Sequence, residues 1–191
     1  MKKILSFAIV LITLHSCKKE KAEYNPTTVE NGSGTLYYQE ANTPNNTNWY
    51  SASEMIGLSL PNISKSADIQ KNIVFGFYNK GDEYGIYSPD NFPKMYGQEN
   101  WQTRLSIKFR KTNLTIVQMQ EWADQYQEKL PPQLIVEEWK KGYNERNYIT
   151  HPQEGETYAF RSNDGKLTAL MMITSVNSFF TSIGFVIWIA K

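Results

Sequence analysis

Several segments of the chain carry the alternating or apolar patterns that are typical of β-strands. Residues 105–110 alternate strictly between apolar and polar side chains, which is the period of a half-buried strand. Apolar runs at 55–60, 69–78 and 84–87 also predict strands. The turn-forming residues 79–82 separate the last two runs, so we expect a hairpin there.

The C-terminal part predicts a three-stranded meander with strands over 157–161, 167–176 and 179–190. Asp164-Gly165 lies between the first two and is a strong hairpin signal. No charged residue occurs over 167–190, so a membrane helix is an alternative. The Thr, Ser and Asn residues in the middle of this segment and its many β-branched residues favour strands.

The apolar run at 185–189 is uninterrupted, which predicts a strand that is covered on both faces. We expect the cover to come from a second sheet or from a helix at 115–130.

A helical pattern begins at Thr115, where Thr115 and Gln118 have the spacing of a capping box. Apolar residues follow at helical spacing up to Tyr126, and Pro131-Pro132 is expected to end the run. A second helix is predicted over 134–141 with Gly142 as its stop, although residues 134–136 are equally compatible with a strand. The fold class is therefore mainly β, sandwich-like or with antiparallel sheets, with one or two helices around 115–141. An α+β fold is the alternative.

The N-terminus has the pattern of a signal peptide. Lys2 and Lys3 precede an apolar run over 4–14, which is shorter than the roughly 20 residues that a membrane-spanning helix needs. Cys17 is the only cysteine and follows this run, with Leu14 three positions before it. The arrangement resembles the lipobox of bacterial lipoproteins, although His15 replaces the usual small residue. We expect residues 1–16 to be removed and Cys17 to carry lipid, including palmitate; an ordinary signal peptide with an incidental cysteine is the alternative.

Residues 17–48 are mostly polar and predict a tether after the lipidated cysteine, with a first edge strand at 35–38. The globular domain is expected over 49–191, a length that suits one domain. Glu20 stands alone among lysines, so an acidic surface-export signal is not evident. The side of the outer membrane that the domain faces is left open.

Charge and cysteine use exclude several classes of function. The chain has 20 Lys and Arg against 19 Asp and Glu, which gives no electrostatic basis for nucleic-acid binding. Removal of residues 1–16 would leave His151 as the only histidine, and lipid would block Cys17. Cys–His catalysis and Cys-ligated zinc are then excluded.

The segments that carry a family resemblance are the lipobox, residues 101–104 continuing into 106–109, and residues 158–166 with the apolar strands around them. In these segments the sequence resembles a broad group of uncharacterised cell-envelope lipoproteins of Gram-negative anaerobes. The resemblance implies a lipid anchor in the outer membrane and one mainly β domain. It implies no activity and no catalytic residues. The sequence also has a fainter similarity to haem-scavenging lipoproteins, but it contains no matching ligand motif, so we expect no cofactor.

Few side chains suggest a catalytic or metal site. His151 lacks an imidazole partner and is expected in a surface loop. Glu154 and Glu156 would share a strand face, which permits the carboxylate pair of a glycosidase but is also typical of solvated acids. Residues 163–165 lack the ligand spacing of a calcium loop and predict a turn, so no metal site is expected.

Aromatic residues beside turns are the remaining candidates for a ligand site. Trp49, Tyr87 and Trp101 each adjoin turn-forming or polar residues, which suggests a loop-borne binding face; the alternative is that they seal the ends of the β domain. We therefore expect a non-catalytic envelope lipoprotein that binds a ligand, glycan or partner protein. The alternative is an acid-catalysed, glycosidase-like hydrolase that uses Asp90, Glu99, Glu154 or Glu156.

Overall fold

A computed structural model of the protein describes residues 25–40, 43, 45–94, 97–127, 129–177, 179 and 181–191. The predicted signal peptide at 1–16 and the predicted lipidation site at Cys17 lie outside these residues.

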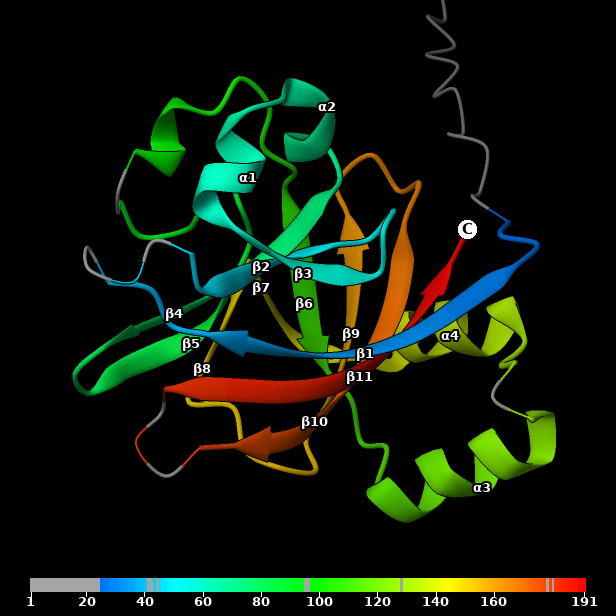
Figure 1. The fold of residues 1–191 in the computed structure, drawn as a ribbon. Helices are drawn as coiled ribbons and strands as arrows, with labels where there is room; N and C mark the ends of the chain where they lie inside the picture. The colour runs from blue at the N-terminus through cyan, green and yellow to red at the C-terminus, as the bar shows by residue number, and fades with distance from the viewer. Residues whose placement is uncertain are drawn as a thin grey trace, which may run out of the picture.

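The predicted C-terminal meander forms the centre of an antiparallel sheet, here called the first sheet (Figure 1). Strands β9, β10 and β11 pair in succession, and the predicted turn at 162–165 joins the first two. The six strands of the first sheet, in spatial order, are β1 (Val29–Tyr37), β11 (Ser182–Ala190), β10 (Thr168–Val176), β9 (Thr157–Ser162), β6 (Ile107–Lys111) and β7 (Tyr143–Arg146).

The second sheet contains the predicted hairpin, in which Lys80 pairs with Glu83 across the turn. Its five strands, in spatial order, are β3 (Ile56–Ser59), β2 (Thr47–Ser51), β4 (Ile73–Lys80), β5 (Glu83–Tyr87) and β8 (Tyr148–Thr150). All pairings in both sheets are antiparallel. The prediction of a mainly β fold with antiparallel sheets is confirmed.

Aromatic side chains fill the space between the two sheets. Tyr50 and Phe75 of the second sheet stack with ring centroids 5.3 Å apart. Phe185 of the first sheet meets both rings edge-on, at 5.0 and 5.4 Å. Tilted and edge-on contacts of this kind favour aromatic packing beyond simple burial. The central core of the molecule is therefore shared by both sheets.

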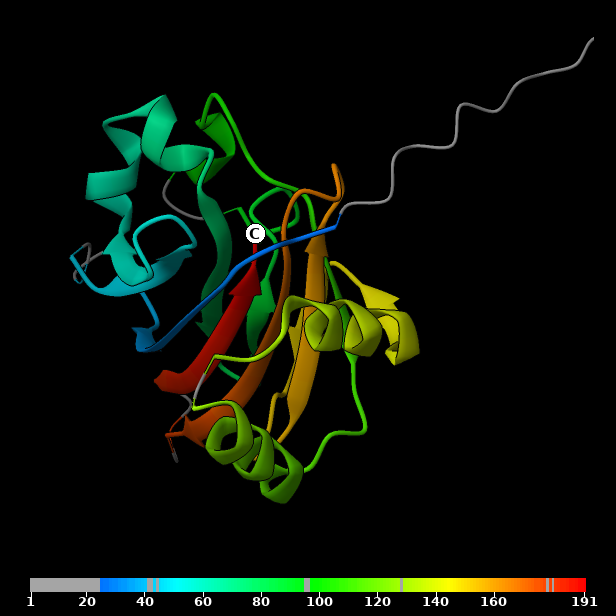
Figure 2. The ribbon, with the colours of Figure 1, turned by 90° about the vertical axis from the view of Figure 1, so that its right-hand side faces the viewer.

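Short helices cover the outer faces of the two sheets, as the side view in Figure 2 shows. Helices α1 (Leu60–Ser64) and α2 (Ala67–Gln70) lie on the side of the second sheet, with the short 3-10 helix η1 (Gln98–Asn100) nearby. Helices α3 (Ile116–Tyr126) and α4 (Pro132–Lys141) lie on the side of the first sheet.

Strand β11 is covered on both faces, as its apolar run predicts. Phe185, Ile187 and Ile189 face the second sheet, whereas Trp188 packs against the helices. Helix α4 provides most of this outer cover through Ile135 and Trp139, so the expected helix at 115–130 has the smaller part.

The predicted capping box of α3 is present. The Thr115 hydroxyl accepts a hydrogen bond from the Gln118 amide nitrogen at 3.3 Å, and the Gln118 side chain accepts one from the Thr115 amide nitrogen at 3.0 Å. The helix ends at Tyr126, before the two prolines. Pro131 and Pro132 instead begin α4, where the missing N–H of a proline in the first turn costs nothing. Residues 134–136 are helical.

Part of the predicted tether is a strand. Residues 29–37 form β1, which pairs with β11 along its whole length, and Leu36 is fully buried. The ordered domain therefore begins before Trp49. The sequence signal is weak because Gly34 lies where a side chain is expected; a Cβ there would come within 3.1 Å of the Phe185 ring.

Two further expectations change. The strand predicted from residue 69 begins at Ile73, because residues 67–70 form α2 with Ser66 as its N-cap. The uncharged residues 167–190 form strands β10 and β11 instead of a membrane helix. Of the helices in the described part of the chain, none has both the length and the apolar character needed to span a membrane.

Candidate binding pocket at the junction of the two sheets

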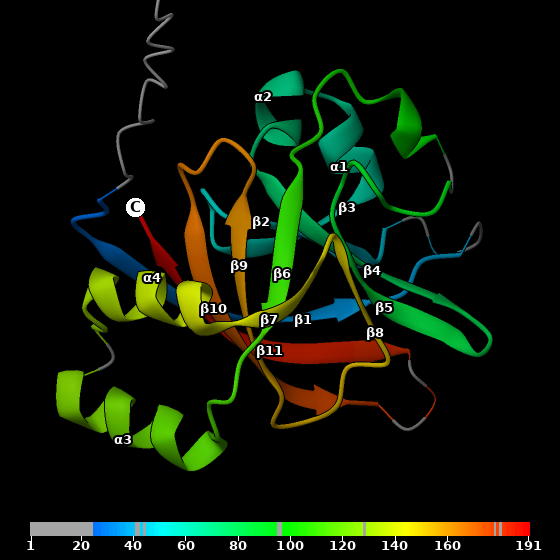
Figure 3. The same cartoon turned by 180° about the vertical axis from the view of Figure 1, so that it is seen from behind.

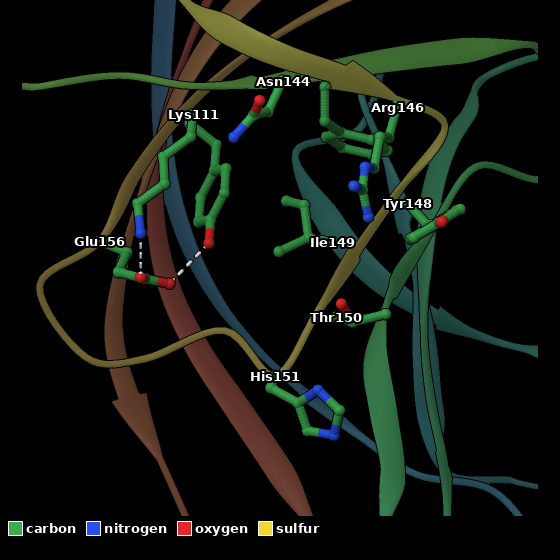
Figure 4. A pocket seen from close by; sticks show the side chains of 10 residues that line it. Lys111, Asn144, Arg146, Tyr148, Ile149, Thr150, His151 and Glu156 are labelled. Atoms are coloured by element: carbon green, nitrogen blue, oxygen red, sulfur yellow. Dashed lines mark hydrogen bonds and ion pairs between the residues drawn. The ribbon is translucent and has the colours of Figure 1, made fainter.

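The chain changes sheets between β7 and β8. Only Asn147 separates the edge strand β7 of the first sheet from the edge strand β8 of the second (Figure 3). A pocket of about 250 Å³ opens at this junction. Figure 4 shows the side chains that line it: Phe109, Lys111, Asn144, Arg146, Tyr148, Ile149, Thr150, His151, Glu156 and Tyr158.

The backbone is distorted on both sides of this junction. Phe109 pairs with Arg146 and Lys111 pairs with Tyr143, so two residues of β7 lie opposite one residue of β6, as in a β-bulge. Asn144, in the bulge, has a φ of +55°, and His151, just after β8, has a φ of +50°. Left-handed conformations of residues other than glycine are uncommon and cluster at functional sites. Both residues line the pocket.

One wall of the pocket is a closed network around Glu156. Lys111 forms an ion pair with one carboxylate oxygen. The other oxygen accepts hydrogen bonds from the Tyr158 hydroxyl at 2.6 Å and from the Gln153 amide nitrogen at 3.0 Å. These contacts tie β6, β9 and the loop between β8 and β9 together.

The same contacts determine how Glu156 and Tyr158 titrate. Burial raises the pKa of Glu156, but the hydrogen bonds from Lys111, Tyr158 and Gln153 outweigh it, and the pKa lies below its usual value. Burial, and then the hydrogen bond to Glu156, raise the pKa of the Tyr158 hydroxyl far above its usual value. At neutral pH this wall therefore presents an ionised carboxylate whose oxygens already accept hydrogen bonds.

The opposite wall carries a cation without an acidic partner in the pocket. The Arg146 guanidinium lies over the Tyr148 ring, 5.7 Å from its centroid. The second aromatic contact of Tyr148 is a stacked arrangement with Tyr87, with centroids 5.8 Å apart. Glu145 does not line the pocket and accepts hydrogen bonds from Arg110 at 2.7 and 2.9 Å. Among the described residues, the pocket lining thus has Lys111 and Arg146 against the single carboxylate of Glu156.

His151 is exposed, as expected of a surface-loop histidine, but its ring is held in place. Its Nε2 lies 2.9 Å from the Asp82 carbonyl oxygen, and the Tyr84 ring meets it edge-on at 4.9 Å. A carbonyl oxygen only accepts hydrogen bonds, so Nε2 carries the proton in this contact. When the ring carries only that proton, its Nδ1 is an acceptor.

The three aromatic residues predicted to form an exposed binding face do not do so. Trp49 is 1% exposed and Trp101 is 7% exposed, and their rings lie 4.8 Å apart in a cluster on the outer face of the second sheet. The chain after β5 covers this face, and Gly76 leaves room for Trp49 and Phe92, because a Cβ there would come within 2.7 Å of both rings. Tyr87 is partly exposed and supports the pocket through Tyr148.

The four carboxylates predicted for a hydrolase are not brought together. Asp90 accepts a hydrogen bond from the Ser88 hydroxyl in the loop after β5. Glu99 lies in η1, with a buried oxygen that has no partner among the described residues. Glu154 and Glu156 both border a second cavity of about 560 Å³ beside the start of α3, but Glu156 is already held by its three donors.

The predicted turn at 162–165 is present. Asp164 accepts hydrogen bonds from the Ser162 hydroxyl at 2.6 Å and from the Lys166 amide nitrogen at 3.1 Å. Within the residues that the structure describes, no group of three or more His, Cys, Asp or Glu side chains is placed to hold a metal ion.

Sequence reasoning missed most of the pocket. Lys111, Asn144, Arg146 and Tyr148 were not among the predicted site residues, and His151 and Glu156 were considered without a common partner. The one signal is the polar and aromatic segment 143–150, which has neither helical nor strict strand periodicity. Such a segment between a helix and a strand is compatible with any loop.

Comparisons with known proteins identify a fold. No protein-family model matches the sequence, and no curated protein matches it. The structure is similar to a crystal structure of a DUF4466 family protein from Parabacteroides merdae, with a TM-score of 0.58 and 16% sequence identity. The match covers 86% of this chain and 54% of that protein, so this chain spans about half its length. At this identity the likeness shows the fold alone.

Proposed function

We propose that this protein is an envelope lipoprotein, anchored in the outer membrane by lipid on Cys17, whose β domain binds a small polar ligand without transforming it. The observation that carries the binding proposal is the pocket at the junction of β7 and β8, which is lined by polar groups from both sheets. Of these, the side chains of Asn144, Arg146 and Thr150 form no hydrogen bond or ion pair among the described residues. A few placed polar groups in a concave site are typical of small-molecule binding.

Binding is favoured over hydrolysis by the state of Glu156. An acid catalyst of a glycosidase must hold a proton near neutral pH, and its partner carboxylate must be free to attack or to activate water. Glu156 has a lowered pKa and accepts hydrogen bonds from Lys111 and Tyr158. Among the residues that the structure describes, it is the only carboxylate that lines this pocket.

The anchor is tested by labelling. Gram-negative cells that express the full chain are grown with radioactive palmitate, and the wild type is compared with Cys17→Ala. Because the Cys17 sulfur is the expected attachment atom, Cys17→Ala is expected to lose all label. Ser16→Ala, which keeps the thiol and a small neighbour, is the matched control and is expected to keep the label. Equal labelling of the wild type and Cys17→Ala would contradict the anchor.

Ligand binding is tested by filling the pocket. Thr150 lines it from β8, and Thr150→Trp is expected to occupy its volume without removing a charged group. Thr35→Trp makes the same change at an exposed position of β1, away from the pocket. Full chains in detergent are melted with a panel of neutral sugars, amino acids, sugar acids and sugar phosphates. A ligand that binds the folded state raises the Tm.

We expect at least one compound to raise the Tm of the wild type and of Thr35→Trp but not that of Thr150→Trp. A panel without effect on the wild type, or an equal rise in Thr150→Trp, would contradict ligand binding in this pocket.

A further inference from the structure

We infer that the ligand of this pocket is a small polyhydroxy acid, and that Arg146 and Asn144 bind its single anionic group, a carboxylate or a phosphate. The inference rests on the proposed binding function and adds the chemical class of the ligand.

The charges in the pocket favour an anion. Lys111 and Glu156 form an ion pair and cancel each other. Arg146 makes no ion pair among the described residues, because Glu145, beside it in the chain, is held by Arg110 away from the pocket. The unmatched charge in the lining is therefore positive, and an anionic ligand group would neutralise it.

The orientation of Arg146 leaves its hydrogen-bond donors available. Its guanidinium lies over the face of Tyr148, and Tyr148 is itself stacked on Tyr87. A guanidinium stacked on a ring keeps its N–H groups in its own plane, where they form paired hydrogen bonds with carboxylate or phosphate oxygens. Tyr148, itself supported by Tyr87, thus gives the Arg146 guanidinium an aromatic contact that favours this arrangement.

The β-bulge brings a second donor into the same pocket. Asn144 lies two residues before Arg146 on β7, and its positive φ accompanies the extra residue of the bulge. Figure 4 shows both side chains directed into the pocket. Within the described ranges the Asn144 amide forms no hydrogen bond, so its N–H groups are available to the same anionic group.

The rest of the pocket fits hydroxyl groups on a small molecule. Phe109 and Ile149 provide apolar lining, while Thr150 and His151 add a hydroxyl and an imidazole to the lining. Nδ1 accepts a hydrogen bond when Nε2 donates to Asp82, and a ligand hydroxyl supplies that donor. At about 250 Å³ the pocket is slightly below the roughly 300–1,000 Å³ typical of ligand sites, which limits the ligand to about one monosaccharide unit.

The test uses glucuronate, glucose 6-phosphate and glucose as probes, titrated calorimetrically into the full chain in detergent. Glucuronate carries a carboxylate and glucose 6-phosphate carries a phosphate, so the two acids show which anionic group the pocket binds. Glucose is the neutral control. We expect the wild type to bind at least one acid at least tenfold more tightly than glucose. Arg146→Gln is expected to lose about tenfold or more of that affinity, since hydrogen bonds to charged groups are among the strong ones. Arg146→Lys is expected to recover only part of it, because lysine cannot form the planar pair.

Arg104→Gln is the matched control, because it removes the same charge from an exposed position outside the pocket. The inference is overturned if glucose binds as tightly as both acids, or if Arg146→Gln loses no more affinity than Arg104→Gln. Binding of neutral compounds from the wider panel, with neither acid bound, overturns the anionic subsite and leaves the proposed binding function standing. The absence of binding by any compound overturns both.

Discussion

Glu156 connects three parts of the chain through its two carboxylate oxygens. Lys111 comes from β6, Tyr158 from β9, and Gln153 from the loop that leads into β9. These contacts hold the β8–β9 loop against the first sheet beside the pocket. The ionised form of Glu156 is the one that all three donors stabilise, so this connection depends on pH.

The pH dependence has a definite sign. Because the pKa of Glu156 is lower in the folded protein than its usual value of 4.5, its contribution to stability is complete above that value. The contribution is lost as the pH falls through the lowered, folded-state pKa. We predict that urea melts at pH 7, 5, 4 and 3 show a steeper acid loss for the wild type than for Glu156→Gln.

Glu154→Gln serves as the control for this prediction, because Glu154 is exposed and two residues away. Its acid profile is expected to follow that of the wild type. A stability difference between the wild type and Glu156→Gln that stays constant from pH 7 to pH 3 would show that the charge of Glu156 is not linked to folding.

At the scale of elements, α3 depends on its N-terminal cap. The helix buries only Met119 fully, so packing contributes little to fixing where it begins. We predict that Thr115→Ala lowers the free energy of unfolding by about 0.5–2 kcal/mol, while Thr115→Asp is tolerated because aspartate also caps. Urea melts of the full chain in detergent measure both.

Val117→Ala is the control for the cap, since Val117 is 61% exposed in the same first turn. Its midpoint is expected to stay close to that of the wild type. Identical midpoints for Thr115→Ala and Val117→Ala would mean that the capping box adds nothing to stability.

Elements with a strong local signal could be predicted from the sequence, and those defined by distant partners could not. The capping box at Thr115 and the Asp164-Gly165 hairpin depend on a few neighbouring residues, and both are present. Strand β1 has glycines at its pairing positions and is defined by β11, from the other end of the chain. Strand β7 is exposed along its whole length and β8 has only three residues, so no apolar period marks them.

The pocket was missed for the same reason. Its walls come from β6, β7, β8 and β9, which belong to two different sheets. Arg146 comes near Lys111 and Glu156 only when β7 pairs with β6, and Tyr148 joins them from the second sheet. The prediction of an exposed aromatic face was wrong because the position of an aromatic residue beside a turn does not determine whether its ring is exposed or covered. The Trp49 ring is covered because Gly76 leaves room for it, and Gly76 is a neighbour of Trp49 only in the folded sheet.

At the scale of the whole molecule, the described residues form three apolar clusters. One fills the space between the sheets, one lies under α3 and α4, and one lies on the outer face of the second sheet. The last contains Trp49 and Trp101. It lies on the opposite face of the second sheet from the sheet–sheet core and is densely aromatic, with Trp49 and Phe92 centroids 4.2 Å apart.

We therefore predict that Trp49→Ala lowers the free energy of unfolding by about 3–5 kcal/mol, the usual cost of truncating a large buried ring. That is a large share of the roughly 5–15 kcal/mol that stabilises a typical domain. Denaturant melts measure it, with Tyr37→Ala on β1 as the control, because Tyr37 is 47% exposed. A loss at Trp49 no greater than at Tyr37 would contradict a structural role for this cluster.

The pairing of β1 with β11 has a consequence for the order of folding events. Hydrogen bonds of this pair reach from Val29 opposite Ala190 to Tyr37 opposite Ser182, and Thr28 and Lys191 are in contact although 163 positions separate them. In the described part of the chain β1 is an edge strand with β11 as its only ladder partner. Contacts between such distant residues close large loops and form late. On the ribosome, β1 is made before residues 182–190 and must wait for them, so the first sheet is completed only after β11 has been synthesised.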